Sequence, residues 1–193
     1  HEDHFSPKVF ALDDGSRDVR FLLGDDIKPT PRRRKKWGLS DETFRKCISL
    51  GGDQTAEPFP GVAVETLRST DAGVAFLVRA DGRVIFHAGD LNWWHWEKHD
   101  PDWNAQMARD FAAYIAPLRG RHIDLAMLPL DPYLGEDSYR GPKAFLELAD
   151  IDHFLPMHQW EDYALTEKFL DRYPQFRDQT EIVRHSGQTF AFP

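Results

Sequence analysis

The sequence predicts an α/β protein in which sheets are covered on the outside by helices. Three observations predict it. Short apolar segments separated by turn residues fill the first half, Asp81-Gly82 between two apolar runs marks a hairpin, and helical periodicity alternates with strand-like segments in the second half. At 193 residues the chain fits one domain, residues 1–193, and can bury a hydrophobic core. No internal repeat or domain linker is evident.

The first half is expected to contain four strands and one helix. A strand is predicted at residues 19–24, and the proline-rich, charged stretch 29–36 is predicted to be a loop. Ser40 is expected to start a helix that continues until Gly51-Gly52. The three remaining strands are predicted at residues 61–68, 72–79 and 83–87.

The second half alternates helices with strands. Helices are expected at residues 104–118, 142–149 and 165–173, because apolar residues recur at helical spacing and Pro142 suits a first turn. Two strands are predicted between them, and two more would form a terminal hairpin. These segments are residues 123–130, 151–156, 181–184 and 189–192.

Composition narrows the function. A net charge of −8 disfavours nucleic-acid binding in general. The basic run at residues 32–36 most simply forms a solvated loop, although it could dock an anionic or phosphorylated substrate. The hypothesis of nucleic-acid processing rests on this basic run alone. It predicts strongly salt-dependent binding of nucleic acid.

Cellular location is inferred from cysteine usage and from hydropathy. Cys47 is the one cysteine, so no intramolecular disulfide can form and a reducing, cytoplasmic location is the default expectation. It falls within the expected helix and has no neighbouring His, which argues against a thiol nucleophile. No apolar run approaches the length of a membrane span.

Candidate metal ligands cluster at the beginning of the chain and recur after two expected strands. His1, Asp3 and His4 lie within one turn. Asp90 follows an apolar strand and Gly89, and His158 follows another strand. Imidazole and carboxylate ligands of this kind suit zinc, and also iron or manganese.

The order of these residues resembles the metallo-β-lactamase superfamily. Its signature is His-x-His-x-Asp-His, then a His, a Gly-Asp and a last His; the first His would lie two residues before His1. The resemblance implies a four-layer αβ/βα sandwich that here lacks its N-terminal strands. We therefore expect this chain to be the C-terminal part of a longer one, or to be completed by a partner segment or a second copy.

One ligand position departs from the family pattern. The third His is expected near residues 68–73, where none occurs. Asp71 could take its place, because a carboxylate can replace imidazole on these metals, or it could simply cap a turn.

The resemblance implies a metallohydrolase that acts on a small molecule, with closest similarity to intracellular sugar-phosphate lactonases. One or two zinc ions, or manganese or iron, would activate a hydroxide toward a carbonyl or phosphoryl substrate such as a lactone or a phosphoester. Asp3 would also be the catalytic residue that orients the hydroxide or takes a proton. The implied ligands are His1, Asp3, His4, Asp71, Asp90 and His158. The alternative is a degenerate, non-catalytic member that binds a metal or another ligand.

Several residues near these ligands could support the site. Trp93, Trp94 and Trp96 could form an apolar wall over the metal or simply fill the core. His95 could hydrogen-bond a metal ligand or be a proton shuttle. Asp131 could orient a metal-bound His, or start a turn before Pro132. Four other histidines are expected to be structural or surface residues. His87 lies on the strand before Asp90, and His122, His153 and His185 have no metal-ligand partners nearby.

Overall fold

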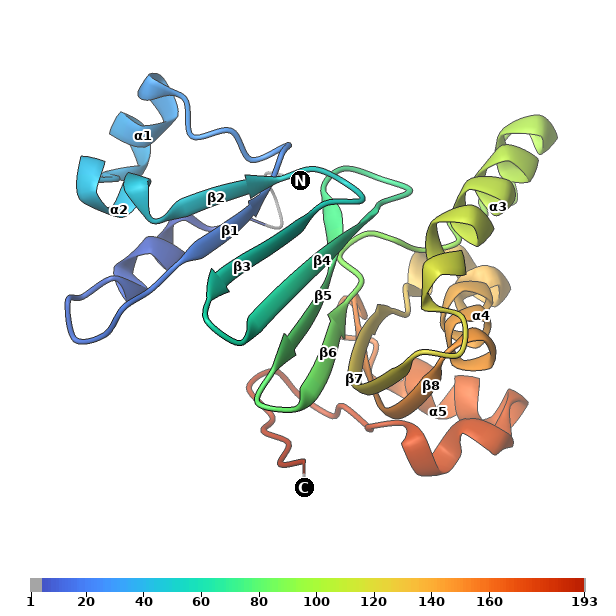
Figure 1. Ribbon diagram of the computed structural model, residues 1–193. Coiled ribbons are helices and arrows are strands. Elements are labelled where there is room, and N and C mark those ends of the chain that lie inside the picture. The colour runs from blue at the N-terminus through green and yellow to red at the C-terminus, as the bar shows by residue number, and fades with distance from the viewer. Residues whose placement is uncertain (1–4, 193) are drawn as a thin grey trace.

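A six-stranded mixed sheet forms the centre of the computed structural model, which describes residues 5–192 (Figure 1). The predicted α/β class is confirmed. The strands follow one another in sequence order, β3 to β6 antiparallel and β6 to β8 parallel. They are β3 (Thr55–Phe59), β4 (Val62–Arg68), β5 (Val74–Ala80), β6 (Arg83–His87), β7 (His122–Pro129) and β8 (Asp150–Met157).

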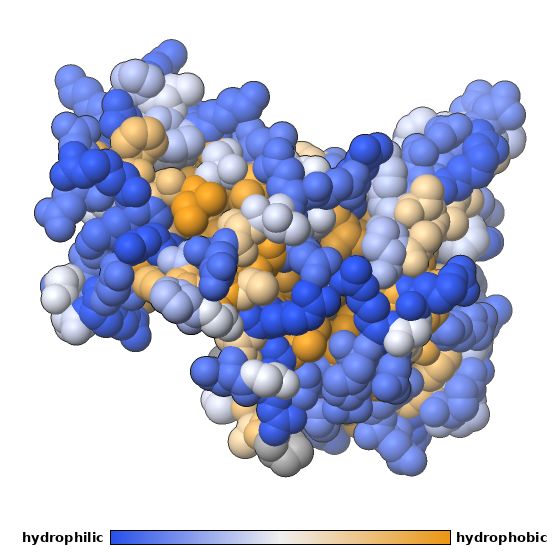
Figure 2. All heavy atoms as spheres, in the orientation of Figure 1, coloured by the Kyte–Doolittle hydropathy of each residue, from blue (hydrophilic) through white to orange (hydrophobic). Residues whose placement is uncertain are grey.

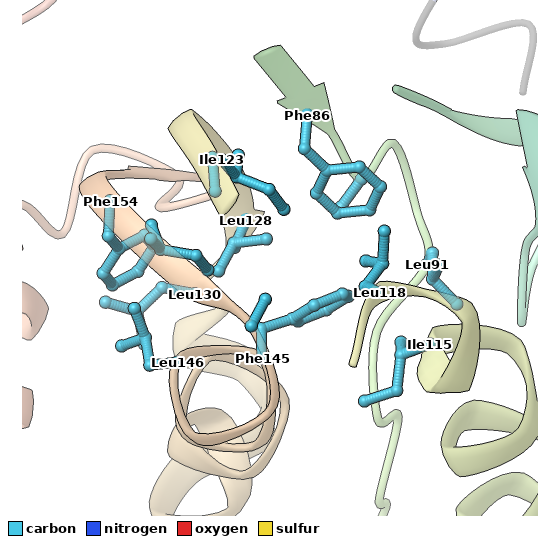
Figure 3. Packing of buried hydrophobic residues seen from close by; sticks show 14 of the residues in the cluster. Phe86, Leu91, Ile115, Leu118, Ile123, Leu128, Leu130, Phe145, Leu146 and Phe154 are labelled. Carbon is cyan, nitrogen blue, oxygen red and sulfur yellow. The ribbon is translucent and has the colours of Figure 1, made fainter. Parts of the chain in front are cut away.

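Helices pack against one face of this sheet, and the main core lies between the helices and the sheet. Phe145 of α4 has its ring centroid 5.5 Å from that of Phe86 on β6 and 5.4 Å from that of Phe111 on α3. Figure 3 shows Phe86, Ile123 and Leu128 of the strands facing Phe145. The covering elements are α3 (Pro101–Ile115), η2 (Ala116–Leu118), η3 (Pro132–Tyr139), α4 (Arg140–Leu148), α5 (Ala164–Arg172) and η4 (Pro174–Gln179).

A smaller layer lies beyond the other face of the large sheet. Strands β1 (Phe21–Gly24) and β2 (Cys47–Leu50) pair in parallel, and a second core around Phe10 and Phe21 packs beneath short helices. These helices are η1 (Pro7–Leu12), α1 (Pro31–Trp37) and α2 (Asp41–Arg45). Helices, large sheet, small sheet and helices thus follow in order (Figure 1).

The two sheets are not closely packed against each other. A pocket of about 690 Å³ lies between them, lined by Leu22 of β1 and by Val74 and Phe76 of β5 among others. Apolar atoms are visible at the surface in the middle of the molecule, with polar surface around them (Figure 2). Within the described residues, no helix combines the length and apolar character needed to cross a bilayer.

The predicted loop at residues 29–36 is wrong, because α1 forms there. The Thr30 side chain accepts a hydrogen bond from the backbone N–H of Arg33 (3.3 Å), and Gly38 ends the helix at φ +66°. Pro31 occupies the first turn, where its fixed φ favours a helix and its missing N–H costs nothing.

The long helix predicted from Ser40 is also wrong in its second half. Helix α2 ends at Arg45, and Cys47 begins β2 instead of lying in a helix. Pairing with β1, in which Phe21 lies opposite Cys47, supplies backbone partners that the local sequence does not reveal. Leu50 is buried as a result.

Two further differences concern strands. Strand β3 was not predicted. It contains Pro58 and is an edge strand, where a proline is tolerated. The predicted terminal hairpin is wrong, since neither 181–184 nor 189–192 forms a strand. The Gln188 side chain instead bonds the Arg184 N–H and the Ile182 carbonyl, at 2.7 and 3.1 Å.

Candidate metal centre

The polar side chains of the candidate site follow the ends of three neighbouring parallel strands. Asp90 comes three residues after β6 ends, Asp131 two residues after β7, and His158 directly after β8. Because β6, β7 and β8 are parallel neighbours, their carboxyl ends meet at one edge of the sheet. The sheet topology therefore brings together residues that are up to 68 positions apart in the sequence (158 minus 90).

The geometry of the three side chains fits a metal ligand held by a carboxylate. His158 Nδ1 lies 2.9 Å from Asp131 Oδ2, so its Nε2 atom points away from Asp131. This Nε2 lies 3.7 Å from Asp90 Oδ1. Two atoms that each bind one ion at about 2.0–2.1 Å can be at most about 4.2 Å apart. The His158 and Asp90 atoms meet this limit and could share an ion.

Burial strengthens the interactions among these groups. The side chains of His158, Asp90 and Asp131 are only 14%, 7% and 4% exposed. The hydrogen bond to Asp131 raises the pKa of His158, burial opposes this shift, and the carboxylate of Asp90 adds to it. Buried carboxylates of this kind are costly unless they are paired with a cation or coordinate a metal.

Backbone contacts fix Asp90. Gly89 adopts φ +56°, and a Cβ atom there would lie 3.1 Å from the carbonyl oxygen of Val74. The carbonyl of Asp90 accepts hydrogen bonds from Trp94 Nε1 (2.9 Å) and from the hydroxyl of Thr70 (3.3 Å). A glycine before Asp90 is thus needed for the turn that aims its side chain.

The backbone around His158 is conformationally unusual. His158, Trp160 and Glu161 have φ values of +64°, +48° and +67°. These values lie in the left-handed region, which residues other than glycine rarely adopt. Such conformations persist only where the surroundings impose them, and they gather at functional sites. Buried Gln159 anchors this turn by donating to the Thr166 hydroxyl at 2.7 Å.

Two pockets open on either side of the Asp90–His158 pair. The 690 Å³ pocket between the sheets and a second pocket of about 360 Å³ have three wall residues in common, Asp90, His158 and Trp160. Asp71 lies in the wall of the smaller pocket, where its carboxylate accepts a hydrogen bond from the Ala72 N–H (2.8 Å). Its assignment as a metal ligand stays a prediction.

Some predicted site residues lie elsewhere. Trp93 packs against Phe111 in the core, and the guanidinium of Arg140 lies 5.4 Å above its ring, because the chain after β6 turns this side chain toward α3 and α4. His95 faces Asp137, 3.7 Å away. Neither lines the two pockets, and their role at the metal site stays a prediction. His1, Asp3 and His4 lie outside the described residues.

Other residues join the pocket that the sequence interpretation did not single out. Trp103, Tyr133 and Trp160 line the smaller pocket together with Trp94 and Trp96. A signal existed for Trp160, which follows His158 by two residues. Trp103 and Tyr133 belong to α3 and η3, and only the tertiary structure shows that they lie at the pocket.

The chain resembles solved structures although no sequence match is found. No protein-family model and no curated protein sequence matches the chain. A proposed metal-dependent hydrolase from Parabacteroides distasonis aligns over 95% of this chain and 72% of its own, with 18% identity and a TM-score of 0.61.

Two structures of the CmlA beta-hydroxylase also align. A variant of CmlA matches 93% of this chain with 11% identity and a TM-score of 0.57. CmlA from Streptomyces venezuelae, a diiron enzyme, matches 85% with 9% identity and a TM-score of 0.51. This chain spans 40% and 38% of those two chains.

The sheet order, its covering helices and these likenesses agree with the expected architecture. The chain has the metallo-β-lactamase fold. Because the sequence identities are below 20%, these likenesses show a shared fold and do not show a shared reaction.

At the other end of the sheet, this metallo-β-lactamase fold carries a second cluster of metal-ligating residue types. His122 lies 3.9 Å from Asp124 and 3.5 Å from Asp152, so the expectation that His122 has no such neighbours is wrong. Parallel pairing of β7 with β8 causes this proximity. The cluster is largely exposed, and Asp124 is already paired with Arg83 at 2.8 Å. It resembles a surface charge network.

Proposed function

We propose that this protein is a metal-dependent hydrolase that acts on a small molecule with a carbonyl or phosphoryl group. The observation that carries the proposal is the arrangement of Asp131, His158 and Asp90. Asp131 holds one ring nitrogen of His158 at 2.9 Å, which leaves the other directed at buried Asp90. Metal-binding histidines commonly donate their second N–H to a carboxylate in this way.

Asp90 and His158 would hold the ion, and His1, Asp3 and His4 are proposed to complete its ligands. Nitrogen and oxygen ligands of this kind accept zinc, iron or manganese. The proposed hydrolase from P. distasonis and diiron CmlA support a metal on this fold. When bound, such an ion polarises a substrate oxygen and lowers the pKa of a coordinated water.

The described residues would position the ion and limit access of water. Asp131 fixes the ring orientation and tautomer of His158 through its hydrogen bond. The rings of Trp94 and Trp160 approach His158 edge-on, with centroids 5.6 and 5.4 Å away. Asp3 is proposed to accept a proton during the reaction.

Metal analysis and a hydrolysis assay test the proposal together. Natively purified protein is analysed by inductively coupled plasma mass spectrometry and assayed with p-nitrophenyl acetate, γ-butyrolactone and bis(p-nitrophenyl) phosphate. We expect one or two ions per chain and metal-dependent hydrolysis of at least one substrate. Asp90→Asn and His158→Gln should lose both metal and activity. Asp152→Asn, at the opposite end of the sheet, should keep both.

The outcomes separate the two hypotheses that the sequence raised. Absence of metal after gentle purification, or hydrolysis that survives Asp90→Asn, would overturn the proposal. Stoichiometric metal without hydrolysis of any ester, lactone or phosphodiester would favour the non-catalytic binding protein instead.

A further inference from the structure

The smaller pocket beside the proposed metal site has aromatic walls. Its volume is about 360 Å³, and it contains four of the six tryptophans in the sequence. The rings of Trp94 and Trp96 are nearly parallel, with centroids 6.5 Å apart, and Tyr133 lies 5.6 Å from Trp160. The aromatic residues of this wall are Trp94, Trp96, Trp103, Tyr133 and Trp160.

Three of these aromatic residues remain exposed to solvent. Trp103, Tyr133 and Trp160 are 38%, 67% and 58% exposed, and they make up half of the exposed large apolar side chains within residues 5–192. Their gathering at one pocket is not explained by core packing. Exposed apolar groups that cluster usually mark a binding site. The left-handed backbone of Trp160 also shows that its position is imposed by the surrounding structure.

The polar part of the pocket is acidic. Asp71, Asp90 and Asp131 contribute carboxylates, and among the described wall residues of this pocket there is no Lys or Arg. The same holds for the described walls of the larger pocket. The basic helix α1 does not compensate, since Arg33 and Lys36 line a separate pocket on the small layer. A phosphate group would therefore meet carboxylates without a basic side chain to balance its charge.

We propose that this pocket binds an organic cation, an alkylammonium group carried by the substrate next to the bond that is cleaved. The inference rests on the proposed function, because Asp90 and His158 form the shared wall where that bond would lie. A cation is attracted to the negative face of an aromatic ring, most strongly to that of Trp. Aromatic walls with nearby carboxylates are the arrangement that recognises ammonium groups.

The inference changes the expected substrate class. The family resemblance suggests sugar-phosphate lactones, whereas the aromatic and acidic walls favour a cationic ester, lactone or related compound. Asp90 and Asp131 also offset part of the positive charge that a metal ion would bring, so that a second cation can approach. Asp71, which is exposed, would face the ammonium group instead of binding the metal.

Binding of simple probes tests the charge preference without requiring catalysis. Tryptophan fluorescence and isothermal titration calorimetry are used on natively purified and on chelator-treated protein. The probes are choline, its uncharged isostere 3,3-dimethylbutan-1-ol, and inorganic phosphate. Choline should bind about tenfold more tightly than the alcohol. Equal binding of the two, or phosphate binding more tightly than choline in metal-free protein, would overturn the inference.

Variants locate the binding in this pocket. Trp103→Leu should weaken choline binding about fivefold, and Trp103→Phe, which keeps an aromatic face, should weaken it less. Asp71→Asn should weaken binding of choline and leave binding of the alcohol unchanged. Phe192→Leu is the matched control, because Phe192 is equally exposed but packs on His153 away from the pocket. Loss of choline binding in Phe192→Leu, or none in Trp103→Leu, would contradict the assignment.

Failure of the inference differs from failure of the proposed function. Metal content and hydrolysis without choline selectivity would overturn the inference alone. Selective choline binding by natively purified protein that contains no metal would support the pocket and overturn the hydrolase.

Discussion

His158 Nδ1 lies 2.9 Å from one carboxylate oxygen of Asp131, while the other oxygen accepts the backbone N–H of Tyr133 at 2.7 Å. Asp131 thus begins η3 and orients His158 at the same time. Because Asp131 is buried and held by two hydrogen bonds, the imidazole cannot rotate freely. The position of Tyr133 in the pocket wall and the direction of His158 depend on the same side chain.

The first prediction concerns metal affinity. Asp131→Asn keeps an oxygen that can accept the Tyr133 N–H, but removes the charge that orients His158 and favours metal binding. Loss of such a partner typically reduces metal affinity 10- to 100-fold. We expect this reduction in a competitive titration with a chromophoric chelator. Unchanged affinity, with circular dichroism showing an intact fold, would mean that His158 does not bind the metal.

The second prediction is a pH dependence of metal-free protein. Since the pKa of His158 is raised in the folded state, its contribution to stability is fully present below the unfolded value of about 6.5. It is lost as the pH rises through the folded pKa. The stability difference between wild type and Asp131→Asn should therefore be larger at pH 5.5 than at pH 9. Urea denaturation measures it, and histidine NMR should show a lower pKa for His158 in the variant.

The third prediction addresses the turn before Asp90. Gly89→Ala should destabilise the protein by about 1–2 kcal/mol, because alanine is disfavoured at positive φ and its Cβ would crowd the Val74 carbonyl. Displacement of Asp90 should also lower metal content. Gly61→Ala is the control: Gly61 has φ +80°, but the space that an alanine methyl group would occupy there is open. It should cost about 1 kcal/mol and leave metal content unchanged.

Elements and site residues set by local sequence patterns were predicted, whereas those that depend on contacts between distant parts of the chain were not. Asp90, Asp131 and His158 were all proposed from the sequence, because each follows a strand predicted from its apolar residues, and the structure brings the three together. Strand β2 was missed because its partner is β1, 26 positions earlier by their first residues (47 minus 21). The helix at Pro31 was missed because proline was interpreted as a breaker and not as a first-turn residue.

The pocket walls show the same limit. Trp94 was proposed from its nearness to Asp90 in the sequence, and it does line the smaller pocket. Its neighbour Trp93 turns into the core, a difference that no local pattern distinguishes. Trp103 and Tyr133 come from elements that meet only when the sheet and helices have assembled.

The fourth prediction tests the main core. Phe145 is 1% exposed and packs between Phe86 and Phe111. Phe145→Ala should lower the free energy of unfolding by about 3–5 kcal/mol, through lost burial and the cavity left behind. Phe145→Leu should cost less because it fills part of the space. Chemical denaturation measures both; a loss below about 1 kcal/mol for alanine would contradict the packing of Phe145 between its two neighbours.

The fifth prediction concerns an ion-pair network on the large sheet. Glu65 of β4 accepts a hydrogen bond from Arg121 at 2.7 Å and pairs with Arg79, and these contacts lower the pKa of Glu65, the Arg121 bond most strongly. Stability from Glu65 is therefore present above its unfolded pKa of about 4.3 and is lost as the pH falls through the lower folded value.

Glu65→Gln should cost about 1 kcal/mol at pH 7, with the cost shrinking toward pH 3. Glu147→Gln, which removes an exposed pair with Lys143 on α4, should cost less than half as much at pH 7. Urea denaturation across this pH range compares the two variants. A cost for Glu65→Gln that is constant with pH would show that the network does not stabilise the ionised carboxylate.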